Sequence, residues 1–313
     1  MLTETKLAIL FLAIIGIKSA VELYPMPLSR LIPKIIFILF ILTCLSTPLY
    51  AQATIAIVVP AHLRPYLDVV DGFKTQLKQE IDIYFLDNNQ LLIKHKLQSK
   101  PWLAVIAIGS QAVSFLNTLQ IKAKHYIYSL IVYPESLKTN KKFSCGIYLP
   151  LPPDQILSVI QEKIPQIKKI VIPFSSSEGK HYVKNIISIG EKKHFKIIPL
   201  AFHHKDILSL LNQMWADFDA ILFIPDPIFS SETIIKFFIQ QAIMHKKAVI
   251  GYNRFFLEQG ALLCFIVDFK KTGVKTASLL TQILQTGVCV SQPAFFNIHI
   301  NKQVWKYLYG KER

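Results

Sequence analysis

The stretch "ILFIPDPIFSS", residues 221–231, is a short apolar run that stops at Pro-Asp-Pro and continues into two serines. Its first four residues have the β-branched and aromatic composition of a buried strand, and serine is a preferred residue at the start of a helix. In open α/β sheets, ligands bind beside the loops where strands end and helices begin. The stretch therefore predicts an α/β sheet that carries Asp226 at the tip of a strand.

The same strand–loop–helix order recurs on both sides of this stretch. Short apolar runs predict strands at 54–60, 81–86, 103–109, 125–134, 169–174, 195–201, 220–225 and 248–252. Between them, apolar residues at helical spacing predict helices at 66–77, 89–99, 110–120, 153–165, 178–192, 205–215 and 231–245. Strands that alternate with helices of this length are typical of βαβ units and parallel sheets.

The alternation runs in two series of similar length, 54–145 and 146–255, which predict two Rossmann-like parallel-sheet lobes. We expect residues 256–290 to return to the first lobe and residues 291–313 to complete the second. The loops at the carboxyl ends of the strands would face each other across a cleft. The crossing points predict hinges near 134–150, 252–258 and 288–295.

Residues 30–53 have the order of a secretory signal. Arg30 and Lys34 precede an apolar run from Ile35 to about Leu45, and Ala51-Gln52-Ala53 is a small-residue cleavage site. The run is shorter than the roughly 20 residues of a membrane span. We therefore expect export to the periplasm or cell envelope, with the mature chain beginning near Gln52 or Thr54.

A second apolar run, residues 7–17, precedes this signal. Under one interpretation, translation begins at Met26, which would give a signal of normal length. Residues 1–25 then reflect a misplaced start. Under the other, residues 7 onward form a membrane anchor, and an uncleaved segment 1–53 associates the protein with the membrane. The sequence leaves both interpretations open.

Charge and motifs exclude several classes of protein. The formal net charge is +15, but the lysines are scattered and no nucleic-acid motif accompanies them. No strand is followed by a glycine-rich phosphate-binding fingerprint, so no nucleotide cofactor is expected. No nucleophile motif and no spacing of metal ligands occurs, so we expect neither catalysis nor a metal site. Beyond the signal, Cys145, Cys264 and Cys289 allow at most one disulfide.

Six blocks of the sequence, taken in order, resemble one known family. They are "DGFKTQL" (71–77), "AIGSQAV" (107–113), "GIYLPLPPDQILSVIQEKIPQIKKIVI" (146–172), "ILFIPDPIFSSETI" (221–234), "VIGYNRFFLEQGALL" (249–263) and "FFNIHINKQVWKYL" (295–308). The chain resembles the ABC-transporter substrate-binding proteins of the periplasmic-binding type I fold, in the branch often found in proteobacteria as stand-alone genes. The resemblance implies two α/β lobes joined by a hinge, which close on a small organic ligand.

Such a protein presents its ligand, here expected to be amino-acid-like, to an ABC-type permease or a sensor. The alternative is a degenerate relative that serves as an envelope accessory or interaction protein without transport. An enzyme on this scaffold is the third possibility, and no set of reactive groups in the sequence favours it.

Residues that follow strands are the candidate ligand contacts: Ser110, Gln111, Ser175, Ser176, Asp226, Tyr252 and Asn253. Asp226 could pair with a ligand amino group, or it could cap the next helix. Ser110 and the free N–H groups of a helix start could bind a carboxylate, or the serine could be a cap. Tyr252 and Asn253 could be hinge residues, ligand contacts or both. Arg254 is the one arginine expected at the cleft, where it could bind a carboxylate.

Overall fold

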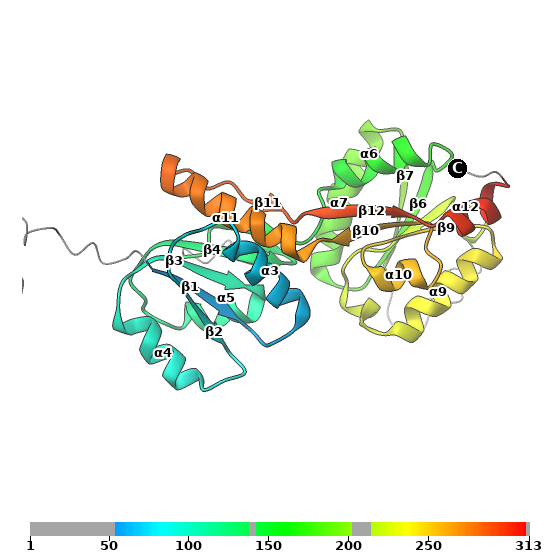
Figure 1. Ribbon diagram of the computed structural model, residues 1–313. Helices are drawn as coiled ribbons and strands as arrows, with labels where there is room; N and C mark the ends of the chain where they lie inside the picture. The colour runs from blue at the N-terminus through cyan, green and yellow to red at the C-terminus, as the bar shows by residue number, and fades with distance from the viewer. Residues whose placement is uncertain (1–53, 138–141, 202–213, 311–313) are drawn as a thin grey trace, which may run out of the picture. The chain divides into compact units, whose positions relative to one another are not determined.

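The structure is a computed structural model that describes residues 54–137, 142–201 and 214–310 (Figure 1). The predicted signal segment, 1–53, and most of the predicted helix 205–215 lie outside the described residues. Within the described ranges, no helix is both long enough and apolar enough to cross a membrane.

The first lobe is built on a six-stranded parallel sheet with the order β11-β5-β4-β3-β1-β2. Its strands are β1 (Ile55–Val59), β2 (Ile81–Phe85), β3 (Trp102–Ile108), β4 (Ala123–Ile131), β5 (Cys145–Tyr148) and β11 (Gln292–Pro293). Its helices are α3 (Arg64–Lys74), α4 (Gln90–Ser99), α5 (Gly109–Asn117) and α11 (Phe269–Thr286), with the short η1 (Pro134–Leu137) after β4. Every residue of β1 is fully buried, as expected for an interior strand covered on both faces.

The second lobe has its own six-stranded sheet, with the order β12-β10-β9-β8-β6-β7. Its strands are β6 (Lys169–Phe174), β7 (Lys196–Ala201), β8 (Ala220–Leu222), β9 (Ala248–Gly251), β10 (Leu263–Val267) and β12 (Phe296–Ile300). Its helices are α6 (Pro153–Lys163), α7 (Ser177–Lys192), η2 (Pro227–Ser230), α9 (Glu232–Met244), α10 (Arg254–Glu258) and α12 (Lys302–Tyr309). Among the described strands, only β12 runs antiparallel to its neighbour, β10. The predicted fold class, two parallel-sheet α/β lobes, is confirmed.

Within the described residues, three short segments join the lobes: residues 149–152, Asp268, and residues 294–295. Ala294 N donates a backbone hydrogen bond to the carbonyl of Tyr148, the residue just before the first segment (2.7 Å), and Asp268 N donates to the Phe295 carbonyl (2.9 Å). The crossing segments therefore lie side by side.

The second crossing comes later in the chain than the sequence predicts. The sequence places residues 256–290 in the first lobe and a hinge at 252–258, but β10 pairs with β9 and β12 of the second sheet. Residues 146–148, predicted in the second lobe, belong to β5, and residues 292–293 form β11 of the first sheet. The apolar run 261–267 has the composition of a buried strand in either sheet, so it could not be assigned to a lobe from its residues.

Two glycines let α3 and α11 pack closely in the first lobe. Figure 1 shows α11, in orange, beside α3, in blue. A Cβ atom on Gly273 would lie 2.0 Å from the Val69 carbonyl oxygen, and one on Gly72 would lie 1.9 Å from the Lys270 carbonyl oxygen. Both obstacles are backbone atoms, so no side-chain rotation can relieve them. The backbones meet where only glycine fits.

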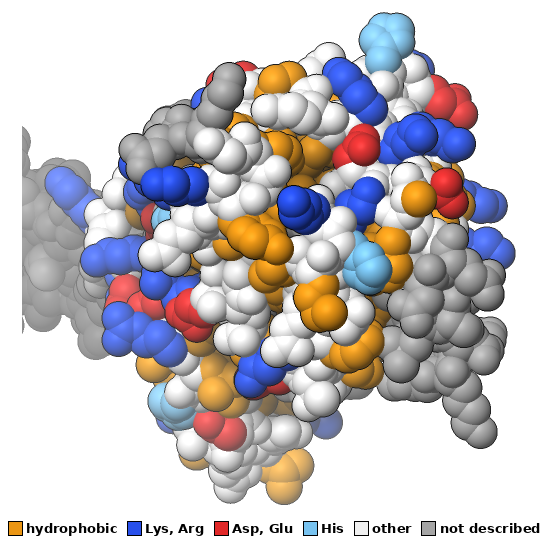
Figure 2. Space-filling model, turned by 90° about the vertical axis from the view of Figure 1, so that its right-hand side faces the viewer, with side chains coloured by type: hydrophobic (Ala, Val, Ile, Leu, Met, Phe, Trp, Pro, Cys, Tyr) orange, Lys and Arg blue, Asp and Glu red, His pale blue; other side chains and the backbone are white. Residues whose placement is uncertain are grey.

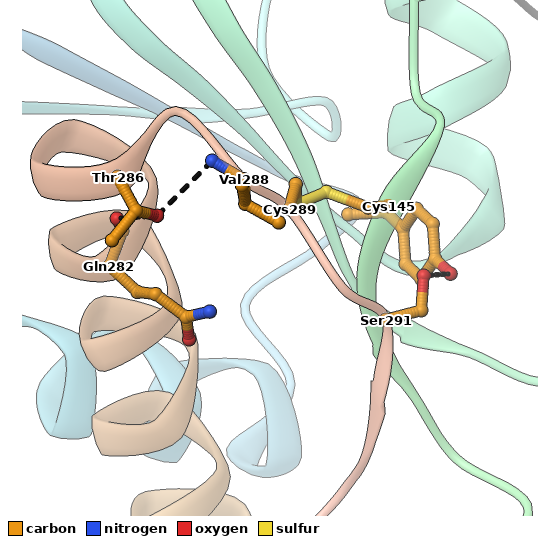
Figure 3. The surroundings of a disulfide bond; sticks show 7 residues. Cys145, Gln282, Thr286, Val288, Cys289 and Ser291 are labelled. Carbon is orange, nitrogen blue, oxygen red and sulfur yellow. Dashed lines mark hydrogen bonds between the residues drawn. A yellow bond between two sulfur atoms is a disulfide. The ribbon is translucent and has the colours of Figure 1, made fainter.

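A disulfide joins Cys145 of β5 to Cys289, which lies between α11 and β11 (Figure 3). The Cα atoms are 6.1 Å apart, within the range of native disulfides. The prediction of at most one disulfide did not specify its partners; Cys264 is a buried free thiol. Near the bridge, the Ser291 hydroxyl is hydrogen-bonded to the Tyr128 hydroxyl at 2.9 Å.

Lysine and arginine side chains lie scattered among apolar and acidic ones on the face shown in Figure 2, without a continuous basic strip. This distribution on that face agrees with the scattering of basic residues along the sequence.

Candidate ligand-binding site

A cavity of about 680 Å³ lies where both lobes and the crossing segments contribute residues. The first lobe supplies Val132, just after β4, and Asp68 of α3. The second lobe supplies residues 222–225, from the end of β8 onward, and residues 251–255, from the end of β9 onward. The first crossing contributes residues 149–151, and further lining residues are Ile156, Tyr182, residues 265–267, Phe269 and Phe296. The volume is typical of small-molecule sites, which occupy about 300–1,000 Å³.

The wall of the cavity is mainly aromatic and aliphatic. Its aromatic members are Tyr182, Phe223, Tyr252, Phe255, Phe265, Phe269 and Phe296. These side chains come from several different elements and loops, so the apolar surface surrounds the cavity. Such a wall suits a ligand with an aromatic or aliphatic body.

Among the described residues, two side chains with formal charges line the cavity, Asp68 and Arg254. The Asp68 carboxylate forms an ion pair with the Arg64 guanidinium, one helical turn earlier, at 2.8 Å. Arg254 is exposed, and no carboxylate in the described part of the chain pairs with it. A guanidinium without such a partner at the edge of an apolar cavity is suited to binding a carboxylate through two parallel hydrogen bonds.

Two tyrosines near the cavity stay un-ionised at neutral pH. Burial, together with the nearby Tyr133 and Asp226, raises the pKa of Tyr252 to about 12. Burial and the Asp226 carboxylate likewise raise the pKa of Tyr133 to about 12. The Tyr133 hydroxyl, from the loop after β4, donates a hydrogen bond to the Pro225 carbonyl after β8. This contact links the two lobes directly.

The Asp226 carboxylate connects two strand-end loops of the second lobe. It accepts hydrogen bonds from the hydroxyls of Ser175 (2.6 Å) and Ser176 (2.7 Å), from the backbone N–H groups of both, and from Ile228 N. The residue is only 6% exposed and does not line the cavity. Five donors occupy its two oxygens, so these contacts favour the capping alternative over pairing with a ligand amine.

The pKa of Asp226 reflects two opposed effects. Burial raises it, but the hydrogen bonds from Ser175, Ser176 and Ile228 outweigh burial and lower it below its ordinary value. Because the folded-state pKa lies below the unfolded one, the carboxylate stabilises the fold above the unfolded pKa of about 3.9. That contribution is lost as the pH falls through the folded-state pKa.

We expect the Asp226→Ala variant of the ligand-free protein to lose about 1–3 kcal/mol of unfolding free energy, because five donors, among them the buried Ile228 N–H, lose their acceptor. Chemical denaturation of the variant and the parent at pH 7 measures the loss. Asp217→Ala, in the loop before β8, is the matched control and should change stability by less than about 0.5 kcal/mol. A parent-like unfolding curve for Asp226→Ala, together with weakened solute binding, would return Asp226 to the set of ligand contacts.

The remaining predicted contacts divide between the cavity and other places. Tyr252 and Asn253 line it, and Asn253 also caps α10 by accepting a hydrogen bond from Phe256 N at 3.2 Å. Ser110 is exposed in the first turn of α5, and no side chain of a described residue caps that helix. Gln111 lines a separate hollow on the first lobe. The structure therefore does not bring Ser110 and Gln111 together with Tyr252 and Asn253.

Sequence reasoning missed most of the apolar wall. Phe223, Phe265 and Phe296 lie in or beside strands, where a phenylalanine has the same sequence pattern as a core residue. Asp68 stands within a helix rather than after a strand. The crossing segment 149–151 carries a proline that indicates a turn, and only the fold shows that it borders a cavity.

No group of three or more His, Cys, Asp or Glu side chains that could hold a metal ion occurs within residues 54–137, 142–201 and 214–310. The histidine pair 203–204 lies outside those ranges.

A family model described as "ABC transporter substrate binding protein" matches residues 138–309, more than half of the chain. The chain belongs to this family. The resemblance expected from the six sequence blocks is thereby confirmed. ABC transporter substrate binding proteins are solute-binding proteins and not a family of enzymes. No curated protein matches the chain.

Several solved structures share the fold of this substrate binding protein. The ABC domain in complex with L-Trp from Streptococcus pneumonia is 20% identical over 82% of this chain and 95% of that chain, with a TM-score of 0.55. A ligand-free, open substrate binding protein with adhesive properties from Clostridium difficile is 18% identical over 83% and 96%, with a TM-score of 0.67. A conserved domain protein from Vibrio cholerae is 19% identical over 82% and 94%, with a TM-score of 0.53. These likenesses support the type I periplasmic binding fold.

Proposed function

We propose that this substrate binding protein captures an amino-acid-like solute in the cavity of about 680 Å³ and presents it to an ABC-type permease or a sensor. The observation that carries the proposal is an aromatic wall beside the Arg254 guanidinium, which has no carboxylate partner among the described residues. Together they match a ligand that has an apolar body and a carboxylate. The L-Trp held by the Streptococcus protein has both features, which makes aromatic amino acids the first solutes to test.

The proposed mechanism is closure of the two lobes on the solute. Each lobe and the first crossing segment hold only part of the wall, so a solute gains its full set of contacts when both lobes reach it. Binding then shifts the population toward the state with more contacts. The three crossing segments are the places where the backbone would bend.

We further propose that the protein works outside the cytoplasm, in the periplasm or cell envelope. Two observations support this location. Residues 30–53 have the composition of a secretory signal, and Cys145 and Cys289 form a disulfide, which persists in oxidising compartments. Mass spectrometry of the N-terminus of the exported protein would test it, because retention of residues 7–17 would favour a membrane anchor over cleavage.

The role of Arg254 gives a direct test of the solute site. We expect the Arg254→Gln variant to bind L-tryptophan about 10- to 100-fold more weakly, because a hydrogen bond to a charged group is worth about 1.5–3 kcal/mol. Isothermal titration calorimetry measures both affinities. Tryptamine, which lacks the carboxylate, should bind the variant at least as tightly as the parent, so a loss of affinity is specific to the group that Arg254 recognises.

Lys302→Gln, an exposed charge change at the start of α12, is the matched control and should leave the affinity for L-tryptophan unchanged. The same titration is run with the other amino acids, so that an aliphatic preference is also detected. Absence of binding by every amino acid would contradict the proposal. The accessory role in the envelope, which requires no solute, would then be the better interpretation.

A further inference from the structure

A second cavity, of about 370 Å³, borders the first. The two cavities share Val132, Pro150, Leu151 and Tyr182, which places both of them against the same crossing segment. Four tyrosines contribute to the wall of the second cavity: Tyr128, Tyr133, Tyr148 and Tyr182. The proposed solute site leaves this cavity without a role.

The charge of the second cavity is opposite to that of the whole chain. The sequence has 35 Lys and Arg against 20 Asp and Glu, yet no described lysine or arginine is among the residues that line this cavity. Glu178 supplies the one carboxylate that the described residues bring to its wall. A hydrogen bond from the Ser177 hydroxyl (2.7 Å) holds the pKa of Glu178 below its ordinary value, so it is ionised at neutral pH.

Hydrogen bonds from the tyrosine hydroxyls hold the wall in place. Tyr182 donates to the Leu151 carbonyl at 2.5 Å, Tyr128 is bonded to the Ser291 hydroxyl at 2.9 Å, and Tyr133 donates to the Pro225 carbonyl. These bonds fix three phenol rings before any ligand arrives. An aromatic ring attracts a cation that lies within about 6 Å of its centroid.

Residues from both lobes meet around this cavity. Glu178, His181, Tyr182 and Asn185 have the spacing of one face of α7 in the second lobe. Tyr128 and Tyr148 belong to β4 and β5 of the first lobe. Two further lining residues are close in sequence to the disulfide: Ser144 precedes Cys145, and Ser291 lies two positions after Cys289. The bridge therefore fixes that part of the wall (Figure 3 shows Ser291).

We propose that the second cavity binds a small organic cation, in which an ammonium group is attracted by the tyrosine rings and neutralised by Glu178. A carboxylate beside several aromatic rings is the chemistry that recognises amines and quaternary ammonium groups. The first cavity differs because it carries Arg254, which would repel such a ligand.

The test compares choline with its neutral isostere 3,3-dimethylbutan-1-ol, by isothermal titration calorimetry on the mature chain with its disulfide intact. We expect choline to bind at least about tenfold more tightly than the isostere, because only choline carries the charge that the rings attract. Glu178→Gln should weaken choline binding about fivefold or more and leave the isostere unaffected. Tyr148→Leu should weaken choline binding, and Tyr148→Phe, which keeps the ring, should restore it.

Two matched variants control for a general effect of surface charge and for binding of choline in the first cavity. Glu191→Gln removes an exposed carboxylate near the end of the same helix and should leave choline binding unchanged. Arg254→Gln, which should weaken L-tryptophan binding at the proposed solute site, should not weaken choline binding. The two proposed sites can therefore fail independently of each other. Equal affinities for choline and the isostere, absence of choline binding, or an equal loss in Glu178→Gln and Glu191→Gln would overturn the proposal.

Discussion

Removal of the disulfide, in the Cys145→Ser, Cys289→Ser double variant, is expected to lower the free energy of unfolding by about 2–5 kcal/mol. The bridge closes a loop across 144 positions of sequence. A loop of that length restricts the unfolded chain strongly, and the chain-entropy account gives about 5 kcal/mol as the upper end. The loss should therefore arise mainly in the unfolded state, with little change in the folded one.

Chemical denaturation of the mature chain, with and without a reductant, measures this effect. Reductant should bring the parent down to the stability of the double variant and should leave the variant itself unchanged. This comparison also controls for the two serines, since the reduced parent keeps both cysteines. Equal stability of the oxidised parent and the double variant would show that the bridge contributes nothing.

The second large effect is expected at the crossing of α3 and α11. In an exposed helix, replacing glycine by alanine stabilises by about 0.5–1 kcal/mol. At Gly273 the sign should reverse, because the new Cβ would lie 2.0 Å from the Val69 carbonyl oxygen and 2.8 Å from Phe73 N. Forcing two backbones apart in a packed interface costs about 1–3 kcal/mol or more. We therefore expect Gly273→Ala to have a free energy of unfolding lower than that of the parent by about 1–3 kcal/mol or more.

Thermal and chemical unfolding of Gly273→Ala test this expectation. Ser278→Ala, on the exposed part of the same helix, is the matched control and should stay within about 0.5 kcal/mol of the parent. Gly72→Ala should resemble Gly273→Ala, since its Cβ meets the Lys270 carbonyl. A stabilised Gly273→Ala would mean that the helices are not in contact at this point.

Local patterns predicted the elements well and the long-range assignments less well. The strand expected at 169–174 is β6 (Lys169–Phe174). A β-branched run bounded by charged and turn residues favours an extended backbone through its own residues alone. The run that forms β10 has the same kind of sequence, but its sheet depends on partners in β9 and β12. The residues of a strand do not indicate which other strands it pairs with, so the sheet that contains β10 could not be predicted from its own sequence.

The candidate site shows the same division between local and distant information. The position after a strand selected Tyr252 and Asn253, which line the cavity; their contact with a ligand stays a prediction. The same rule selected Asp226, but its carboxylate is occupied by Ser175 and Ser176, about fifty residues earlier in the chain. A strand-end position predicts that a side chain lies near the cleft. It does not predict which neighbours have already taken its hydrogen bonds.

The Cys145–Cys289 bridge also decides what a protease can separate. The covalent ring that it closes contains β6 to β10 and α11, which is most of the second lobe and the helix that returns from it. A single cut anywhere between residues 146 and 288 opens the ring without dividing the molecule, because the two pieces remain joined through sulfur. Only reduction, or a second cut, releases a fragment from a chain nicked in that region.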